Sequence, residues 1–376
     1  MKRTLLAALA AVCALALAAC AFVYPRLGQL PEGERRAAVE ASPNYRDGAF
    51  RNTLPTPILT DGSSFLTALV RGRFEPRERP RPPAALPTVK TDLKALPRER
   101  DTVIWLGHSS FYVQVGGRRI LIDPVFSDHA APLPWMVKAF KGTTLYTVDD
   151  LPPIDYLLVT HDHYDHLDHA TVRALAPRTR LAITGLGTGA HLLDWGWAPQ
   201  QVREADWFTT LQLEPGLALH VLPARHYSGR FLRRNQALWV GFALETPQRR
   251  LFFSGDTGFG PHFAEIARRL GGFDLAVLDA GQYNPRWAHI HMNPEEAAQA
   301  AEVLQARALL AAHAGRFALA RHAWDEPFHR IAAASEGKPY ALLTPRIGEP
   351  VHLDQPQQRF PRWWEGVAGD PRTSPH

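Results

Sequence analysis

The sequence lacks several features that would each indicate a class of protein. It has only two cysteines among 376 residues, and Cys13 lies within an N-terminal apolar run that export would remove, which excludes an internal disulfide framework. Its arginines are spread along the chain without the long basic block of a nucleic-acid arm. The glycines Gly185, Gly187 and Gly189 lack the lysine of a P-loop and the GxGxxG order, so they predict a tight turn instead of a nucleotide loop.

The composition is that of a folded protein with a mild basic excess. Hydrophobic residues make up 45% of the chain, enough for one large core or two ordinary ones. The net charge is +5, and without Lys2 and Arg3 the counts are 40 basic and 37 acidic residues, a net charge of +3. This excess suits an anionic membrane surface or an anionic substrate, although many ordinary surfaces carry as much.

The N-terminus has the pattern of an export signal. Lys2 and Arg3 precede an apolar run from Thr4 to Ala19, which is too short for a comfortable membrane span. The run ends in Leu-Ala-Ala followed by Cys20, which resembles the lipobox of bacterial lipoproteins. That resemblance implies removal of residues 1–19 and lipidation of Cys20, whose several acyl chains would anchor the protein firmly. An ordinary signal peptide with an incidental cysteine is the alternative.

The expected location follows from the same residues. Ala21 after the cysteine resembles the pattern that permits transfer to the outer membrane of a bacterium with two membranes. We therefore expect an exported lipoprotein, anchored in the outer membrane through Cys20 and facing the periplasm of a Gram-negative bacterium.

Residues 20–101 are rich in proline and arginine and show little periodicity. The stretch from Arg77 to Pro83 favours extended, polyproline-like backbone, and a short helix is predicted over 63–70. We expect a tether followed by an arm laid over the catalytic domain, with disorder as an equal alternative. The catalytic domain is predicted at 102–353, and the proline-rich tail at 354–376 has no predicted element.

Alternating strands and helices predict an α/β domain. Two apolar runs joined by Gly116-Gly117 predict a hairpin of 110–115 with 118–122. Asn293, Pro294 and Glu296 predict the start of a helix that runs to about 306. A long loop is predicted over 125–150. Further strands are predicted at 103–106, 155–160, 181–184, 218–222, 238–245, 250–254, 274–278 and 309–312, one or two edge strands within 340–353, and helices at 168–175, 261–270 and 327–334.

A dense cluster of potential metal ligands follows the strand predicted at 155–160. His161 and His163, two residues apart, can bracket one ion, and the adjacent Asp165 and His166 can face a second. Histidine nitrogens and carboxylate oxygens with an open position for water are the ligands of hydrolytic zinc sites. The cluster therefore predicts part of a two-metal hydrolase site.

Three further groups each follow a predicted strand. They are His226, Asp256 and His313. Strand ends along one edge of a layered α/β domain converge on a cleft, so these groups can meet the cluster at 161–166 despite their separation in sequence. We expect all seven groups to lie together at one sheet edge.

The ordered set resembles the ligand order of the metallo-β-lactamase superfamily. The matching elements are His-x-His-x-Asp-His at 161–166, the later histidines at 226 and 313, and Ser-Gly-Asp-Thr-Gly at 254–258. The resemblance covers about 102–353 and implies an αββα four-layer sandwich with two zinc ions. It implies that one ion is held by His161, His163 and His226, the other by Asp165, His166 and His313, and both by Asp256.

A narrower resemblance is to the N-acylphosphatidylethanolamine phospholipase D branch. It lies in residues 105–111, 121–126, 291–297 and 317–320, and in the arm at 47–52. Members of that branch are zinc phosphodiesterases that release N-acylethanolamine from a membrane phospholipid. The lipobox departs from the branch and puts the natural substrate in doubt, and a related lactonase branch shares the ligands.

Other polar residues have two interpretations each. His108 either lies near the cleft mouth and binds substrate or caps a turn. His291 either contacts substrate and takes part in catalysis or supports the turn before a helix. Asp123 either orients a ligand histidine or, the interpretation that we favour, forms a turn. Asp162 and Asp168 are interpreted as local caps.

The predicted function is that of a binuclear zinc hydrolase, with Mn or Fe as other possible metals. Two zinc ions, the carboxylates Asp165 and Asp256 and one hydroxide sum to about +1, which would attract an anionic phosphodiester. A metal-bound hydroxide would then cleave N-acylphosphatidylethanolamine-like membrane lipids without a separate base. We expect Asp165, Asp256 and His291 to be catalytic.

Two other functions fit the same residues. A lactonase or ester hydrolase would use the same site, and a non-catalytic lipoprotein that binds metal or lipid would hold metal without turnover. The expected partners are a membrane phospholipid substrate and the membrane surface, with no nucleic acid. The oligomeric state stays open.

Overall fold

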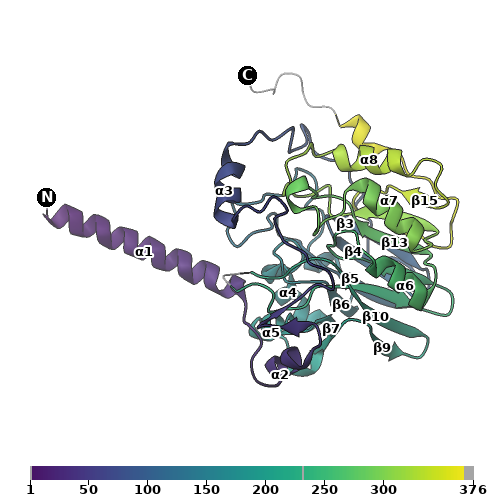
Figure 1. The fold of residues 1–376 in the computed structure, drawn as a ribbon, viewed down its shortest axis with the longest axis horizontal. Helices are drawn as coiled ribbons and strands as arrows, with labels where there is room; N and C mark the ends of the chain where they lie inside the picture. The colour runs from purple at the N-terminus through teal and green to yellow at the C-terminus, as the bar shows by residue number, and fades with distance from the viewer. Residues whose placement is uncertain (1, 231–232, 368–376) are drawn as a thin grey trace.

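The computed structural model describes residues 2–230 and 233–367. A helix, α1 (Lys2–Leu27), projects away from the folded domain, to the left in Figure 1. Cys13 and Cys20 are both exposed on this helix. Among the described residues, no helix combines the length and hydropathy needed to cross a membrane. The export signal and the lipidation of Cys20 stay predictions.

The first sheet has seven strands, two of which form the predicted hairpin. Their order is β16 (Pro350–His352), β3 (Thr102–Gly107), β4 (Ser110–Val115), β5 (Arg118–Ile122), β6 (Ile154–Val159), β7 (Thr179–Gly185) and β8 (Val202–Ala205). Gly116 and Gly117 both have positive φ, at 57° and 71°, which the two-residue turn between β4 and β5 requires. The sheet is mixed, because β16 to β5 pair antiparallel and β5 to β8 pair parallel.

The second sheet repeats this plan with seven other strands. Their order is β15 (Ala341–Leu343), β14 (Ala308–Ala312), β13 (Leu275–Asp279), β12 (Arg250–Phe253), β11 (Val240–Glu245), β10 (Leu217–Pro223) and β9 (Thr209–Glu214). Strands β9 to β12 pair antiparallel and β12 to β15 pair parallel.

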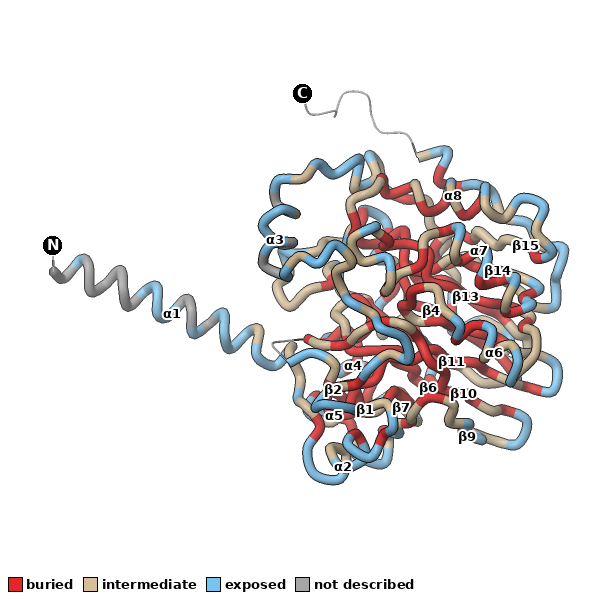
Figure 2. Tube along the Cα trace, in the orientation of Figure 1, coloured by how far each residue is buried: buried red, intermediate tan, exposed pale blue. Residues whose placement is uncertain are grey.

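The two sheets pack face to face, and helices cover both outer faces. Alternate residues of β6 point to opposite sides: Leu158 joins the core between the sheets, and Leu157 joins the outer cluster. The outer cluster of the first sheet contains residues of α4 (His169–Leu175) and α5 (Gly189–Asp194). That of the second sheet contains residues of α6 (His262–Leu270), α7 (Pro294–Val303) and α8 (Glu326–Ala334). Figure 2 shows buried chain throughout the sheets, which confirms the predicted αββα sandwich.

The N-terminal arm packs against the domain over much of its length. It contains α2 (Gly33–Ala41), the short strands β1 (Tyr45–Arg46) and β2 (Ala49–Phe50), and α3 (Phe65–Phe74), which begins at the cap Ser64. Phe50 is fully buried in the core between the sheets, and Leu86 and Leu93 are also buried. The described part of the arm is therefore an ordered layer of the molecule.

The structure also contains elements that the sequence did not predict. The edge strands β8 and β9 and the helix α5 were missed. α5 begins at Gly189, where a tight turn was predicted, and a Cβ there would lie 2.8 Å from side-chain atoms of Glu204 and Val202. In the tail, Trp363 and Trp364 are buried against Phe328. The predicted loop at 125–150 is confirmed, with a single 3-10 turn at Val148–Asp150.

Candidate metal centre

Four strand ends deliver the predicted ligands to one place. The loop that carries residues 161–166 follows β6, and His313 follows β14 directly. His226 lies three residues after β10, and Asp256 three residues after β12. The predicted convergence at one sheet edge is therefore observed, with ligands from both sheets.

Three histidines form what we call the first group: His161, His163 and His226. His161 Nε2 lies 2.9 Å from His163 Nδ1, and His226 Nε2 lies 3.2 Å from the same atom. With one oxygen of Asp256, the potential ligand atoms of this group all lie within 4.8 Å of one another. Three imidazole nitrogens and a carboxylate are a ligand set that suits zinc.

The second group is Asp165, His166 and His313. His166 Nε2 lies 3.5 Å from Asp165 Oδ2, and His313 Nε2 lies 4.0 Å from the same oxygen. Asp256 lies between the two groups, with Oδ2 3.1 Å from His166 Nε2 and 3.7 Å from the Nε2 atoms of both His161 and His226. Asp256 is therefore placed to serve both groups.

His226 and His166 each use Nδ1 for a hydrogen bond outside the centre, so that Nε2 faces the centre. His226 Nδ1 donates to the carbonyl of Ile290 (2.9 Å), and His166 Nδ1 donates to Asp123 Oδ2 (2.8 Å). Each of these bonds fixes a tautomer in which Nε2 is a lone-pair ligand. Within the described residues, His166 Nε2, His313 Nε2 and Asp256 Oδ1 are buried without a hydrogen-bond partner. Such unsatisfied polar atoms are rare in proteins, and bound metal would satisfy them, so these residues fit a metal centre.

Burial and neighbouring charges shift the pKa values of the site residues. Burial lowers the pKa of His161, His226 and His313 well below the ordinary value, which keeps these rings neutral. Burial raises the pKa of Asp256. Burial opposes charge on His166 as well, but Asp256 and Asp165 raise its pKa well above the ordinary value. The buried carboxylates thus stabilise positive charge in the centre, and a bound metal ion would supply that charge.

Two residues with alternative interpretations contact the ligands directly. His108 is fully buried, and its Nε2 lies 2.9 Å from Asp165 Oδ2. The structure therefore does not place His108 at the cleft mouth, and its predicted substrate contact stays a prediction. Asp123 has a positive φ of 43° and also accepts hydrogen bonds from His166 and Thr160. Asp123 therefore lies in a bend, as the favoured interpretation has it, and its carboxylate also contacts the potential ligand His166, as the other interpretation has it.

Of the two remaining aspartates, Asp168 is the predicted local cap, whereas Asp162 makes a long-range contact instead. Asp168 Oδ1 accepts from Ala170 N at the start of α4, and Asp162 Oδ1 accepts from Gly229 N at 2.7 Å. Neither side chain belongs to the groups of potential metal ligands found among the described residues.

His291 lies beside the centre and is held by an aspartate that was not predicted. Its Nδ1 donates to Asp279 Oδ2 at 2.8 Å, and its ring stacks on His313 with 4.9 Å between centroids. Asp279 is fully buried at the end of β13. The sequence carried a signal for it, because an acidic residue after an apolar strand is the pattern that identified Asp256.

A cleft of about 570 Å³ opens onto the centre. His163, Asp165, Asp256, His291 and His313 reach its surface. The rest of the wall combines apolar and polar side chains. The apolar ones are Ile58, Leu59, Ala130, Trp287, Ile290 and Leu319. The polar ones are Tyr164, Tyr227, Arg230, Arg234 and Gln282. Sequence reasoning did not assign these wall residues to the site, although Leu319 lies in the segment 317–320 of the narrower resemblance.

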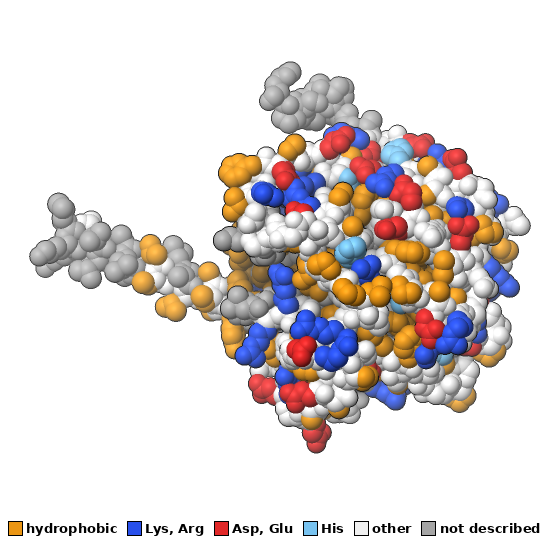
Figure 3. Space-filling model, viewed as in Figure 1, with side chains coloured by type: hydrophobic (Ala, Val, Ile, Leu, Met, Phe, Trp, Pro, Cys, Tyr) orange, Lys and Arg blue, Asp and Glu red, His pale blue; other side chains and the backbone are white. Residues whose placement is uncertain are grey.

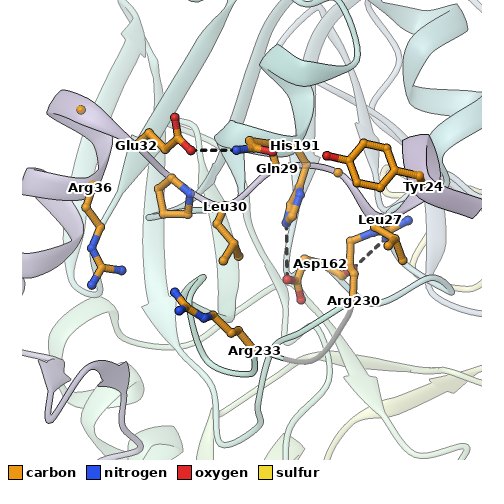
Figure 4. Close-up of a pocket in the computed structure, with 13 residues that line it drawn as sticks. Tyr24, Leu27, Gln29, Leu30, Glu32, Arg36, Asp162, His191, Arg230 and Arg233 are labelled. Carbon is orange, nitrogen blue, oxygen red and sulfur yellow. Dashed lines mark hydrogen bonds and ion pairs between the residues drawn. The ribbon is translucent and has the colours of Figure 1, made fainter.

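A larger cavity of about 900 Å³ lies beside the loop that carries residues 161–166, and Asp162 of that loop lines it (Figure 4). It is enclosed by residues 24–36 on one side and by Asp162, His191 and Arg230 on the other. The guanidinium of Arg230 is buried and donates to the carbonyls of Asp162, Leu167 and Arg26. Arg230 lines both cavities, and Figure 3 shows several basic side chains gathered near the base of α1.

Comparison with known proteins is consistent with this geometry. The sequence family described as "Beta-lactamase superfamily domain" matches residues 118–314. An uncharacterized protein of Mycobacterium tuberculosis is 38% identical over 333 residues, which cover 88% of this chain and 89% of that protein. N-acyl-phosphatidylethanolamine-hydrolyzing phospholipase D 1 of Caenorhabditis elegans is 33% identical over 240 residues, covering 57% of this chain and 63% of the worm protein.

A solved structure shares the fold. Igni18, a metallo hydrolase from the hyperthermophilic archaeon Ignicoccus hospitalis, superposes with a TM-score of 0.52 and 21% sequence identity. The superposition covers 67% of this chain and 97% of that protein. At this identity the likeness concerns the fold alone.

Proposed function

The chain belongs to the metallo-β-lactamase superfamily and is a metal-dependent hydrolase, and on that premise we propose that it is a binuclear zinc phosphodiesterase of the phospholipase D type. The proposed substrates are N-acylphosphatidylethanolamine-like membrane lipids. The observation that carries the proposal is the position of Asp256 between the two groups of potential ligands, within 3.7 Å of His161, His166 and His226, beside a cleft that these groups reach.

The cleft supports a substrate that is both anionic and apolar. Arg230 and Arg234 line the cleft, and their positive charge favours a negatively charged phosphodiester, although the donors of Arg230 are bound to backbone carbonyls. Ile58, Leu59 and Leu319 supply apolar surface of the kind that accepts acyl chains. The likeness to the Caenorhabditis elegans phospholipase D supports the same substrate class.

The residues of this chain have distinct proposed roles. His161, His163 and His226 would hold one zinc ion, Asp165, His166 and His313 the other, and Asp256 would contact both. When bound, the metal ions activate water as the nucleophile and stabilise negative charge on the phosphoryl oxygens.

His291 is the proposed proton donor to the leaving oxygen. Asp279 accepts the Nδ1 proton, which leaves Nε2 as the atom that exchanges a proton with substrate. The ring also reaches the cleft surface, where a substrate would lie.

The proposal includes a place at the membrane. Lipidation of Cys20, which is exposed, would tether the domain through α1 to the outer membrane on the periplasmic side. Exposed apolar side chains around the domain, among them Trp135, Met136 and Leu319, would suit contact with lipid. No nucleic acid is proposed as a partner.

The test is a substrate panel with purified, zinc-loaded full-length protein. The panel contains N-acylphosphatidylethanolamine in detergent micelles, phosphatidylethanolamine and a long-chain N-acyl lactone, with products resolved by mass spectrometry. We expect release of N-acylethanolamine and phosphatidic acid, and loss of this activity on treatment with a chelator. Hydrolysis of the lactone alone would overturn the phosphodiesterase in favour of a lactonase. Stoichiometric zinc without turnover of any substrate would favour a binding protein.

A further inference from the structure

We propose that Asn52, in the N-terminal arm, is a positioning residue for His226, so that the arm forms part of the metal centre. This inference rests on the proposed function to the extent that His226 binds metal. The arm lies outside residues 118–314, which match the family. It was predicted as a covering layer, and its residues 47–52 contributed to the narrower resemblance without an assigned role. Its contacts assign it a role in the site itself.

Asn52 binds the backbone of His226 through both atoms of its amide. Asn52 Nδ2 donates to the carbonyl oxygen of His226 at 2.7 Å, and His226 N donates to Asn52 Oδ1 at 3.1 Å. Oδ1 also accepts from the indole nitrogen of Trp239 at 3.0 Å. Only a side chain with one donor and one acceptor in this geometry can make both bonds to His226, and the side-chain amide provides both.

His226 requires such support because of its position in the chain. It lies between β10 and β11, where the described residues 224–230 form no helix or strand, so no strand ladder fixes its backbone. The bond from Nδ1 to the carbonyl of Ile290 orients the ring, and the two bonds to Asn52 fix the main chain that carries it. Ring and backbone together determine where Nε2 points.

The adjacent residue is held by the same part of the arm. Arg225 donates from Nε to Thr56 Oγ1 at 3.0 Å and from Nη2 to the carbonyl of Pro55 at 3.2 Å. The arm therefore binds two consecutive residues of the segment that carries a ligand. Beyond these contacts the arm continues to Ile58 and Leu59, which line the cleft.

The arm is itself firmly fixed, which a positioning element requires. Phe50, two residues before Asn52, is fully buried between the sheets, and its backbone nitrogen donates to the carbonyl of Asn235 at 2.8 Å. The side chain of Gln236 donates to the carbonyl of Gly48 at 2.9 Å. Asn52 is thus anchored to the sandwich and transmits that rigidity to His226.

The test measures metal affinity, which can be read without any substrate. Full-length wild-type protein and Asn52→Ala are stripped of metal and titrated with zinc against a chromophoric chelator. We expect one of the two zinc equivalents to bind about 10- to 100-fold more weakly in Asn52→Ala, the size typical of lost outer contacts to a ligand. In the cobalt-substituted protein, the visible absorption of that site should shift, because the geometry of His226 changes.

Asn44→Ala is the matched control. Asn44 belongs to the same arm, and its side chain donates to Asp206 Oδ1 at 2.8 Å, a residue outside the ligand groups. Both zinc affinities and the cobalt spectrum should be unchanged in this variant. A loss in both asparagine variants would indicate a general role of the arm in stability and would overturn the specific role of Asn52.

Asn52→Asp keeps the inference testable if the alanine variant does not fold. The carboxylate has the same shape but cannot donate to the His226 carbonyl, so the same zinc equivalent should weaken. Unchanged zinc affinities in a folded Asn52 variant would overturn the proposal. A wild-type protein that binds two zinc ions but leaves the lipid intact would overturn the proposed substrate and not this role. A wild-type protein that binds no zinc would overturn both.

Discussion

The two ligand groups of the centre differ in what holds them in place. In the second group, His166 donates to the carboxylate of Asp123, and His108 contacts Asp165. In the first group, His226 donates to a backbone carbonyl, and His161 faces the hydroxyl of Thr160. The second group is therefore supported by charged or ionisable side chains, and the first by neutral acceptors. Because a carboxylate partner makes a ligand imidazole more basic, we expect the second group to bind metal more tightly.

The two ligand groups also differ in charge and in exposure. Asp165 belongs to the second group, whereas Asp256 lies within 3.7 Å of histidines of both groups. His163 of the first group is the one histidine of the two groups that is partly exposed. The first group is thus the more accessible and the less negative, which suits exchange with solvent and substrate.

Removal of the shared ligand should have the largest effect. In Asp256→Ala both groups lose the carboxylate between them, and we expect hydrolysis to fall by at least about 10³-fold, since metal stabilisation of several kcal/mol is lost. Zinc content by mass spectrometry should fall together with activity. Asp149→Ala, at an exposed residue paired with Arg178, should leave both unchanged. Retention of both zinc ions in Asp256→Ala would contradict the shared role.

Chelation should separate the two groups. With the wild-type protein and dipicolinate, we expect zinc to leave in two phases, the first group before the second, because the first is more accessible and supported by neutral acceptors. His163→Ala should abolish the fast phase and keep one tightly bound equivalent. A single phase, or loss of both equivalents in His163→Ala, would show that the groups do not act separately.

Asp123→Asn should reverse the order of the two groups. The amide keeps the shape of the carboxylate but loses its charge, and one of its atoms then faces the donor of Thr160 or of His166. We expect zinc in the second group to bind about 10- to 100-fold more weakly. A smaller effect on the first group is expected, because Thr160 connects Asp123 to His161. Zinc titration of the metal-free protein measures both.

Asp155→Asn provides the control for this substitution. Asp155 bonds to Arg98 and to the backbone of Arg119, away from the ligands. Zinc binding should be unchanged in Asp155→Asn. Equal weakening of both groups in Asp123→Asn would contradict the direct role in the second group.

The sequence allowed prediction of those parts of the site that local rules determine. The cluster at 161–166 is a local motif, and His313 directly follows a buried strand, so strand ends sufficed to place them. Asp279 was missed although it directly follows the strand predicted at 274–278, because the ligand order that guided the prediction does not include it. Asn52 could not be predicted, because its role depends on packing of a proline- and arginine-rich arm that has no periodicity. The strands β8 and β9 lie at sheet edges and alternate in burial over only a few residues, which leaves a weak signal.

The smallest expected effect concerns a neutral contact within the second group. Ser109 Oγ lies 3.1 Å from His313 Nδ1, which also lies 3.1 Å from Asp256 Oδ1. Because the hydroxyl is a neutral partner of the ring, Ser109→Ala should cost about 1 kcal/mol of zinc binding, roughly fivefold in affinity.

Ser110→Ala is the neighbouring control for this last substitution. Ser110 is equally enclosed, but its hydroxyl donates to the carbonyl of Asp123 and accepts from Val125 N, so its loss should lower the melting temperature and leave zinc affinity unchanged. If Ser109→Ala weakened zinc binding as much as Asp123→Asn, neutral and charged partners would support the ligands equally. The contrast between the two groups would then lie in exposure alone, because a hydroxyl would hold a histidine as firmly as a carboxylate does.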